Sequence, residues 1–224
     1  MKASECPPNR VNPNRCLLRA RRRRGARHGR RPRGHRVPND RRIEHRPAEG
    51  ATRSSFGHWE GDLLIFSRAG TGANVTTLVE RRSRFLVLLA NPDRRPAGIA
   101  ERIGTALGGL AADLRETVTF DRGFEFMGYP ALDRRLGTTS YFCEPRSPWQ
   151  KGAVENANGR LRRYLPSDVP AEQLSADSLN ELACRLNATP RRCLGYRTPA
   201  EVFHGRLDPI PAKEDSTVTL SHLG

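Results

Sequence analysis

One segment, SPWQKGAVENANGRLRRY at 147–164, constrains the fold of this chain more than any other part of the sequence. Its start favours a helix, because Ser147 is a good N-cap, Pro148 suits the first helical position and Gln150 completes a capping box. At about 100° per residue the helix carries two separate stripes. The apolar stripe contains Val154, Ala157, Leu161 and Leu165. The polar stripe contains Glu155, Asn158, Gly159 and Arg162. We therefore expect an amphipathic helix with a single carboxylate on its exposed face.

The polar stripe suits a metal ion that lies next to a phosphate backbone. The carboxylate of Glu155 would hold the cation, Arg162 would meet the phosphate, and Gly159 would permit a close approach. The alternative is an ordinary amphipathic helix with a solvated polar face. The segment alone does not decide between these two interpretations.

Two further segments place aspartates where burial without a partner is costly. The run HWEGDLLIF at 58–66 is typical of a strand and has Asp62 inside it. In TVTFDRGFEF at 117–126, a short β-prone run ends at Asp121, and Gly123 suits a turn. Carboxylates that converge on Mg²⁺ avoid this cost. Paired metals about 3.5–4 Å apart can hold the attacking and the leaving oxygens of phosphoryl transfer. The three segments together predict a metal-dependent site of this kind.

The blocks WEGD, TFDRGFEF and PRSPWQKGAVENANGRLRRYLP occur in this order and resemble the catalytic blocks of the insertion-sequence-30 family of bacterial DDE transposases. This family belongs to the group with a retroviral-integrase-like catalytic core. The resemblance covers roughly residues 37–203 and includes NVTTLVERRSRF and YRTPAEVF. It implies that Asp62 and Asp121 are the catalytic aspartates and Glu155 the catalytic glutamate. Arg122 stands where the family commonly has asparagine, which removes no metal ligand but bears on the local hydrogen bonding.

The resemblance implies a DNA transposase that performs metal-dependent cleavage and strand transfer at the ends of an insertion element. Asp62, Asp121 and Glu155 would bind two Mg²⁺ ions, with Mn²⁺ able to substitute. The implied partners are DNA, as element ends and as target, and further copies of the chain in a homo-oligomer on DNA. The residues expected to contact DNA are Arg21, Arg22, Arg23, Arg24, Lys151, Asn158, Arg162 and Arg163.

Two other functions stay open at this point. Members of the family carry a helix-turn-helix region before a basic linker, and Met1 lies about where that linker begins. The chain therefore also resembles a truncated, non-catalytic transposase remnant that binds DNA or dimerises. A metal nuclease of the same fold is the third possibility, although the final block is typical of transposases.

Other residues near the proposed triad have alternative roles. Strand alternation places His58 and Glu60 on the same face as Asp62, which makes a different ligand cluster conceivable. Glu125 is expected to pair with a nearby arginine rather than with a metal. Trp149 suits the core, or it could stack on a splayed base.

Positive charge is concentrated at the start of the chain. The whole sequence has a formal net charge of +15, and residues 1–47 hold 16 basic residues but only 3 acidic ones. Such a segment should be disordered and solvated, and it should bind polyanions with a strong salt dependence. The alternative is a flexible linker whose charge does no specific work. A targeting peptide is not expected, because no apolar segment follows the basic run.

The order of the expected elements predicts an α/β fold with a ribonuclease-H-like mixed sheet flanked by helices. Strands are expected at 58–66, 74–80, 84–90, 117–121 and 139–143. Helices are expected at about 96–114, 129–136 and 175–187, and from Pro148 and Pro199 onward. The predicted domains are a basic arm at 1–47, an integrase-like catalytic core at 48–205 and a tail at 206–224.

Several classes of protein do not fit this composition. No apolar stretch approaches the roughly 20 residues of a membrane span. The five cysteines show no CxxC pairing, which favours reduced thiols over a disulfide framework, and there is no zinc signature. These features favour a cytoplasmic protein without a membrane span, and the resemblance implies a bacterial protein that associates with the nucleoid.

Overall fold

The computed structural model describes residues 37–66 and 72–207, and the arm residues Arg21 to Arg24 lie outside this part. Its centre is one sheet with the strand order β3-β2-β1-β4-β5. Antiparallel pairing joins β1 to β2 and β2 to β3, whereas β1, β4 and β5 are parallel. The strands are β1 (His58–Ile65), β2 (Asn74–Glu80), β3 (Leu86–Asn91), β4 (Thr117–Phe120) and β5 (Thr139–Phe142). The predicted mixed sheet is confirmed.

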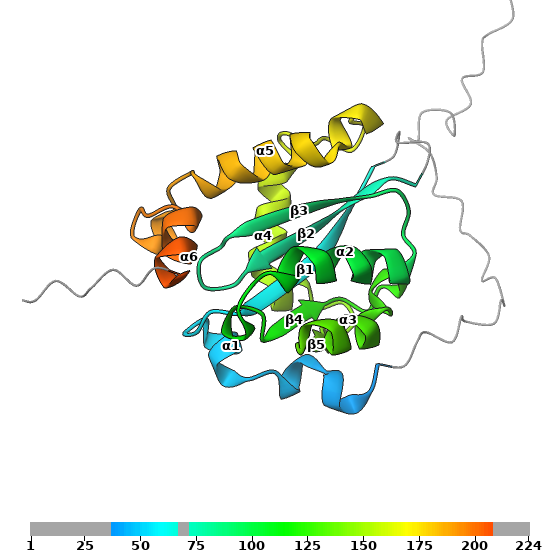
Figure 1. Ribbon diagram of the computed structural model, residues 1–224, viewed down its shortest axis with the longest axis vertical. Coiled ribbons are helices and arrows are strands. Elements are labelled where there is room, and N and C mark those ends of the chain that lie inside the picture. Colours follow the sequence, from blue (N-terminus) through cyan, green and yellow to red (C-terminus); the bar gives the residue numbers. More distant parts are fainter. Residues whose placement is uncertain (1–36, 67–71, 208–224) are drawn as a thin grey trace, which may run out of the picture. The chain divides into compact units, whose positions relative to one another are not determined.

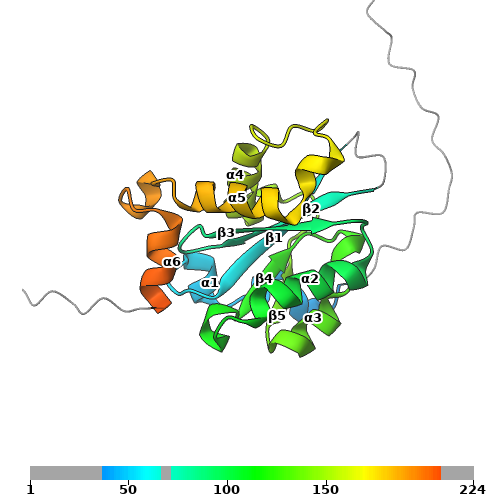
Figure 2. The ribbon, with the colours of Figure 1, turned by 45° about the horizontal axis from the view of Figure 1, so that its top comes forward.

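Helices cover both faces of this sheet (Figures 1 and 2). On one face lie α2 (Pro96–Gly108) and α3 (Tyr129–Leu136), which pack on each other. On the other face lie α4 (Gly152–Leu161) and α5 (Ala176–Asn187). The short α1 (Ala48–Thr52) precedes β1, and α6 (Pro199–Leu207) ends the described chain. Within the described residues, no helix is both long enough and apolar enough to cross a membrane.

Strand alternation divides the core into two apolar clusters, one on each face of the sheet. In β2, Val79 packs with Val154 and Leu161 of α4, whereas Leu78 packs in the cluster that contains Ile103 and Leu132. The apolar stripe predicted for the helix that carries Glu155 is therefore confirmed, since three of its members are buried and Ala157 packs against them. Through this stripe, α4 packs on one face of the sheet, against apolar side chains of β1, β2 and β3.

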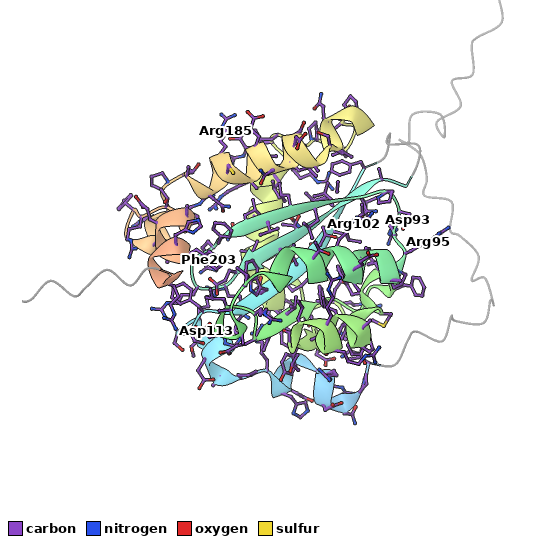
Figure 3. All side chains as sticks on the ribbon, in the orientation of Figure 1. Asp93, Arg95, Arg102, Asp113, Arg185 and Phe203 are labelled. Atoms are coloured by element: carbon purple, nitrogen blue, oxygen red, sulfur yellow. The ribbon has the colours of Figure 1, made fainter. Side chains whose placement is uncertain are left out.

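The last helix, α6, contributes one aromatic ring to the apolar cluster that contains Leu78, Ile103 and Leu132. Phe203 of α6, labelled in Figure 3, stacks on Phe85 with ring centroids 4.5 Å apart. It also meets Trp59 edge-on at 5.9 Å. Trp59 itself is buried, and its indole nitrogen donates to the carbonyl of Leu114 at 2.8 Å. The segment YRTPAEVF thus covers the core beside the β2–β3 turn.

Two predicted boundaries were wrong for local reasons. The helix expected at 96–114 ends at Gly108, and a 3₁₀ turn at Ala112–Leu114 follows. Consecutive glycines stop it because glycine is a poor helix former. The third strand begins at Leu86 rather than at 84. In the turn before it, Arg84 has φ +64°, and the carboxylate of Glu80 accepts hydrogen bonds from the backbone and hydroxyl of Ser83.

The folded core also begins earlier than the predicted boundary at residue 48. Residues Asn39–Arg41 and Ile43–His45 form 3₁₀ helices. Arg41 pairs with Asp133 at 2.8 Å, and Arg46 donates to the hydroxyl of Thr119 at 3.1 Å. The high charge density suggested a solvated arm, but these two arginines have partners in α3 and in β4. The end of the core is closer to the predicted boundary at residue 205, since α6 extends to Leu207.

Candidate functional site

Two of the predicted ligand residues lie close together in the middle of the sheet, where β4 ends beside β1. Asp62 is in β1, and Asp121 directly follows β4, the parallel neighbour of β1. The ammonium nitrogen of Lys151 is 3.1 Å from Oδ1 of Asp62 and 3.4 Å from Oδ2 of Asp121. Both carboxylates are therefore within contact distance of the same positive charge.

Lys151 has a different environment from the one expected of a DNA-contacting lysine. Its side chain is only 7 % exposed, and its ammonium donates a hydrogen bond to Asp62. Burial alone would lower the pKa of Lys151, but the attraction of Asp62 and Asp121 outweighs burial and raises this pKa above its ordinary value. Lys151 thus remains charged and neutralises the two aspartates.

Glu60 anchors the start of α4 to β1. Its carboxylate is fully buried, and Oε2 accepts hydrogen bonds from the backbone nitrogens of Ala153 at 2.8 Å and Val154 at 2.9 Å. The guanidinium of Arg81 lies 3.4 Å from the other carboxylate oxygen. A negative charge at the N-terminus of a helix is favourable because the unpaired backbone N–H groups point toward it. Glu60 therefore fixes the helix that carries Glu155.

This role was missed in the sequence, where Glu60 was considered only as an alternative metal ligand. Alternation did place Glu60 and Asp62 on one face of β1, and both residues contact the segment 151–158. His58 is also buried, and its ring nitrogens lie 2.8 Å from the hydroxyl of Thr117 and 3.0 Å from that of Ser55. Burial, followed by the repulsion of nearby arginines, lowers the pKa of His58. These structural bonds leave no support for a ligand cluster of His58, Glu60 and Asp62.

The polar stripe of α4 follows the length of β1 but is not uniformly exposed. Asn158 donates from Nδ2 to Oδ2 of Asp62 at 2.8 Å. Further along, Arg162 donates to the carbonyl of Ile65 at 3.0 Å, and its guanidinium lies 5.1 Å from the ring centroid of Phe66. Two residues expected to contact DNA, Asn158 and Arg162, therefore make contacts within the fold.

Glu155 lies between the two residues of this segment that contact Asp62. It is four residues after Lys151 and three before Asn158, and residues at such spacings share one side of a helix. The Glu155 side chain is exposed and lines a hollow together with Arg160 and Arg163. As the side chains stand, no group of three His, Cys, Asp or Glu residues in the described parts of the chain lies close enough to hold a metal ion. The structure thus brings Asp62 and Asp121 to one ammonium group and leaves Glu155 exposed on the helix that carries Asn158.

The helix begins differently from the predicted capping box. Residues Pro148–Lys151 form a 3₁₀ helix, and the α-helix starts only at Gly152. The side chain of Ser147 makes no capping hydrogen bond, and Oε1 of Gln150 instead accepts from the backbone nitrogen of Glu144 at 2.8 Å. The prediction was wrong because Glu60, from a distant part of the sequence, supplies the cap.

The residue that departs from the family pattern links the ends of two strands. Arg122 donates to the carbonyl of Cys143 at 3.0 Å and to the carboxylate of Glu144 at 2.7 Å. Its neighbour Gly123 donates its backbone N–H to Oδ1 of Asp121 at 2.9 Å. A Cβ atom at Gly123 would lie 2.8 Å from the same oxygen, so a larger residue there would shift the Asp121 carboxylate. The loop therefore orients Asp121 with short backbone contacts.

Two aromatic side chains near the site are exposed. Trp149 is 74 % exposed, which excludes the core role considered for it, and Phe124 is 58 % exposed. Trp149 is two residues before Lys151, and Phe124 is three residues after Asp121. Glu125, by contrast, pairs with Arg94 at 3.2 Å, as the sequence predicted. Phe124 was missed because an isolated phenylalanine after a strand is indistinguishable from a core residue.

No family model matches the sequence, but individual relatives do. The transposase for insertion sequence element IS1086 of Cupriavidus metallidurans is 39 % identical over 188 residues, which cover 84 % of this chain and 55 % of the relative. Transposase InsI for insertion sequence element IS30C of Escherichia coli K12 is 35 % identical over 167 residues, covering 75 % of this chain and 43 % of the relative. The chain thus spans about half the length of these curated relatives.

Two solved structures are similar to this chain in fold. A chain of the simian T-cell lymphotropic virus intasome, in complex with a PP2A regulatory subunit, has a TM-score of 0.56 at 20 % identity, with 75 % of this chain and 61 % of that chain covered. The catalytic core domain of BIV integrase has a TM-score of 0.52 at 21 % identity, with 68 % and 97 % covered. The fold is therefore that of an integrase catalytic core. Over the compared residues, the chain is a homologue of the insertion-sequence-30 family of transposases, as its three sequence blocks predicted.

Proposed function

We propose that this chain carries the catalytic core of a DNA transposase, which cleaves and joins DNA by metal-dependent phosphoryl transfer. The observation that carries this proposal is the approach of Asp62 and Asp121 to one shared positive charge. They come from neighbouring parallel strands, beside the helix that carries Glu155. The curated relatives, which are named transposases, supply the reaction class.

The residues present fit a divalent metal. Carboxylate and amide oxygens are the ligands that hard cations prefer. Besides the two aspartates, Oδ1 of Asn158 is buried and has no hydrogen-bond partner, although Nδ2 of the same amide is bonded to Asp62. A buried acceptor without a partner is rare and suggests an absent ligand or water. The two aspartates lie against the ammonium of Lys151, and the amide of Asn158 is joined to Asp62, so these oxygen-bearing groups belong to one cluster.

We infer that Asp62, Asp121 and Glu155 hold two Mg²⁺ ions, for which Mn²⁺ can substitute. When bound, such ions activate the attacking oxygen and stabilise the leaving oxygen of an in-line displacement. Asp62 and Asp121 are already oriented by Lys151, Asn158 and the loop at Gly123. Glu155 would complete the ligand set by a rotation of its exposed side chain, on a helix that Glu60 fixes to β1.

Lys151 then has two successive roles in this proposal. Before a metal binds, its ammonium prevents the repulsion of two neighbouring carboxylates. With a metal bound between the aspartates, the ammonium of Lys151 would be available to a phosphate of the substrate. DNA is the substrate and partner that this chemistry requires, and a homo-oligomer on DNA would present two such sites to it.

The proposal is tested by metal-dependent cleavage and strand transfer on duplex DNA carrying the ends of the element. Asp62→Asn, Asp121→Asn and Glu155→Gln should each lower the rate more than about 100-fold, because even outer-shell partners of a metal site cost about 10–100-fold. The matched control is Asp113→Asn, a half-exposed aspartate paired with Arg206 and labelled in Figure 3. Full activity in any one triad variant would remove that residue from the site. Absence of cleavage by the unmodified chain with Mg²⁺ or Mn²⁺ would favour the non-catalytic remnant.

A further inference from the structure

A second hollow lies on the side of α4 that is turned away from Asp62 and adjoins the hollow beside Glu155. It is a cavity of about 280 Å³ between α4, the turn from β2 to β3 and the end of α5. Its apolar lining includes Val79, Leu86 and Leu186, while its charged lining consists of Arg53, Arg84, Arg160 and Arg191. None of the described residues that line it is acidic. Four positive charges therefore surround a partly apolar cavity.

These arginines lack the partners that usually accompany clustered charge. Within the described chain, the side chains of Arg53, Arg84 and Arg160 form no hydrogen bond or ion pair. Arg191 donates one bond to the carbonyl of Leu186 at 2.9 Å, but its Nε is buried without a partner. Burial and then the repulsion of Arg160 lower the pKa of Arg191. Glu80 acts electrostatically on Arg84 but is buried in its turn and bonded to Ser83, outside the lining.

The backbone holds two of the arginines in a conformation that is uncommon for residues other than glycine. Arg53 ends α1 at φ +63°, and Arg84 lies in the β2–β3 turn at φ +64°. Such left-handed positions persist only where the surrounding structure fixes them, and they are frequent at ligand sites. Arg53 and Arg84 are thus presented from two different turns toward one cavity.

The cavity and the candidate active site share α4 but use different sides of it. Asn156 and Arg160 line the cavity, whereas Asn158 contacts Asp62. A step of two residues rotates a helix position by about 200°, which turns the two sets away from each other. Asn156 and Arg160 also line two adjoining hollows, one with Glu155 and Arg163 and the other with Arg191 and Arg192. A path lined by arginines therefore leads from the cavity to Glu155.

We propose that this cavity binds a phosphate group of a DNA strand and that the adjoining hollows guide the strand past Glu155 to the aspartates. Guanidinium groups match phosphate oxygens with paired hydrogen bonds, and a bound phosphate supplies the missing counter-charge. The apolar lining suits the sugar or base of the same nucleotide. The choice of DNA as the source of the phosphate rests on the proposed function.

An exposed cysteine provides a direct probe. Cys193 lines the cavity, and Cys184 of α5 is also exposed but does not line it. In the full chain with EDTA, a short duplex oligonucleotide should slow alkylation of Cys193 at least about 10-fold and leave Cys184 unchanged, measured by peptide mass spectrometry. Inorganic phosphate at the same phosphate concentration should protect much less, because it forms no further backbone contacts. Equal protection by inorganic phosphate would show that the cavity binds a free anion and would overturn the assignment to DNA. Absence of protection by either compound would overturn the phosphate site.

Charge removal gives a second test. Arg84→Gln and Arg160→Gln remove side chains without partners in the described chain, so the fold should be retained. Each variant should weaken duplex binding and reduce the slope of log K against log salt by about 1, as expected for one phosphate contact. Arg134→Gln, on the exposed side of α3 across the sheet, removes the same charge and should leave the slope unchanged. An equal change of the salt slope in all three variants would show that DNA responds to the overall charge of the chain, and this result would overturn the phosphate site.

The two proposals fail separately. Protection of Cys193 without metal-dependent cleavage would retain the phosphate site and contradict the catalytic proposal. Cleavage that depends on Asp62 but is accompanied by an unprotected Cys193 would retain catalysis and overturn the phosphate site.

Discussion

Replacement of Glu60 should remove the contacts that hold the start of α4 against β1 and should lower the stability of the fold. In Glu60→Ala, the backbone nitrogens of Ala153 and Val154 lose their acceptor, and Arg81 loses the carboxylate 3.4 Å away. Hydrogen bonds to a charged group contribute about 1.5–3 kcal/mol each. Breaking a buried ion pair by removing one partner costs about 3–5 kcal/mol. Because these contributions overlap, we expect Glu60→Ala to lower the free energy of unfolding by about 4 kcal/mol.

Two further variants separate the hydrogen bonds from the charge. The amide oxygen of Glu60→Gln can still accept the two backbone bonds, so this variant should lose only about 2 kcal/mol. Combining Glu60→Gln with Arg81→Met removes the unpaired buried charge and should recover part of that loss. Asp113→Asn breaks a half-exposed ion pair and should cost less than about 1 kcal/mol.

Urea unfolding followed by tryptophan fluorescence measures these differences. Trp59 is buried and reports unfolding, whereas Trp149 is already exposed and changes little. The dependence of the unfolding free energy on urea should keep the same slope in every variant, since the surface exposed on unfolding is unchanged. A loss below about 1.5 kcal/mol in Glu60→Ala would refute the idea that this carboxylate anchors α4.

Three other changes test the electrostatics of the core. Lys151→Met leaves Asp62 and Asp121 without their shared cation. In EDTA this variant should have a lower melting temperature than the unmodified chain, and added Mg²⁺ should raise the melting temperature of the variant more. An equal rise in both proteins would show that Lys151 does not occupy the cation position. Burial raises the pKa of Glu80 above its ordinary value of 4.5, so the folded state favours the protonated form, and the resulting stability is lost as the pH rises through the folded pKa. Glu80→Gln should therefore gain stability relative to the unmodified chain between acidic and neutral pH, and a constant difference in urea unfolding would contradict this. Burial raises the pKa of Cys143 to about 12, so maleimide should label Cys184 in the native chain long before Cys143; equal labelling rates would show that the thiol of Cys143 is accessible.

The sequence by itself determined the elements whose signal is local. The alternation in β1 placed Asp62 and Glu60 on one face, and the helical period of Val154, Leu161 and Leu165 identified the buried side of α4. These patterns hold because burial repeats with the geometry of a strand or a helix. The blocks around Asp62, Asp121 and Glu155 also pointed to the family, and the homologues confirm it.

Only the tertiary structure decided which charges meet. The capping box predicted at Ser147 gave way to Glu60, because a carboxylate buried in β1 must be paired and the open backbone nitrogens of α4 are adjacent to it. The basic side chain of Lys151 suggested a contact with DNA. In the structure it is buried between two aspartates that are 30 and 89 positions away in the sequence. Arg53, Arg84 and Arg160 lie in separate segments and meet only because a turn, a hairpin and a helix pack together. Sequence spacing carries no information about such distances, since packing of the apolar faces brings these charged residues together.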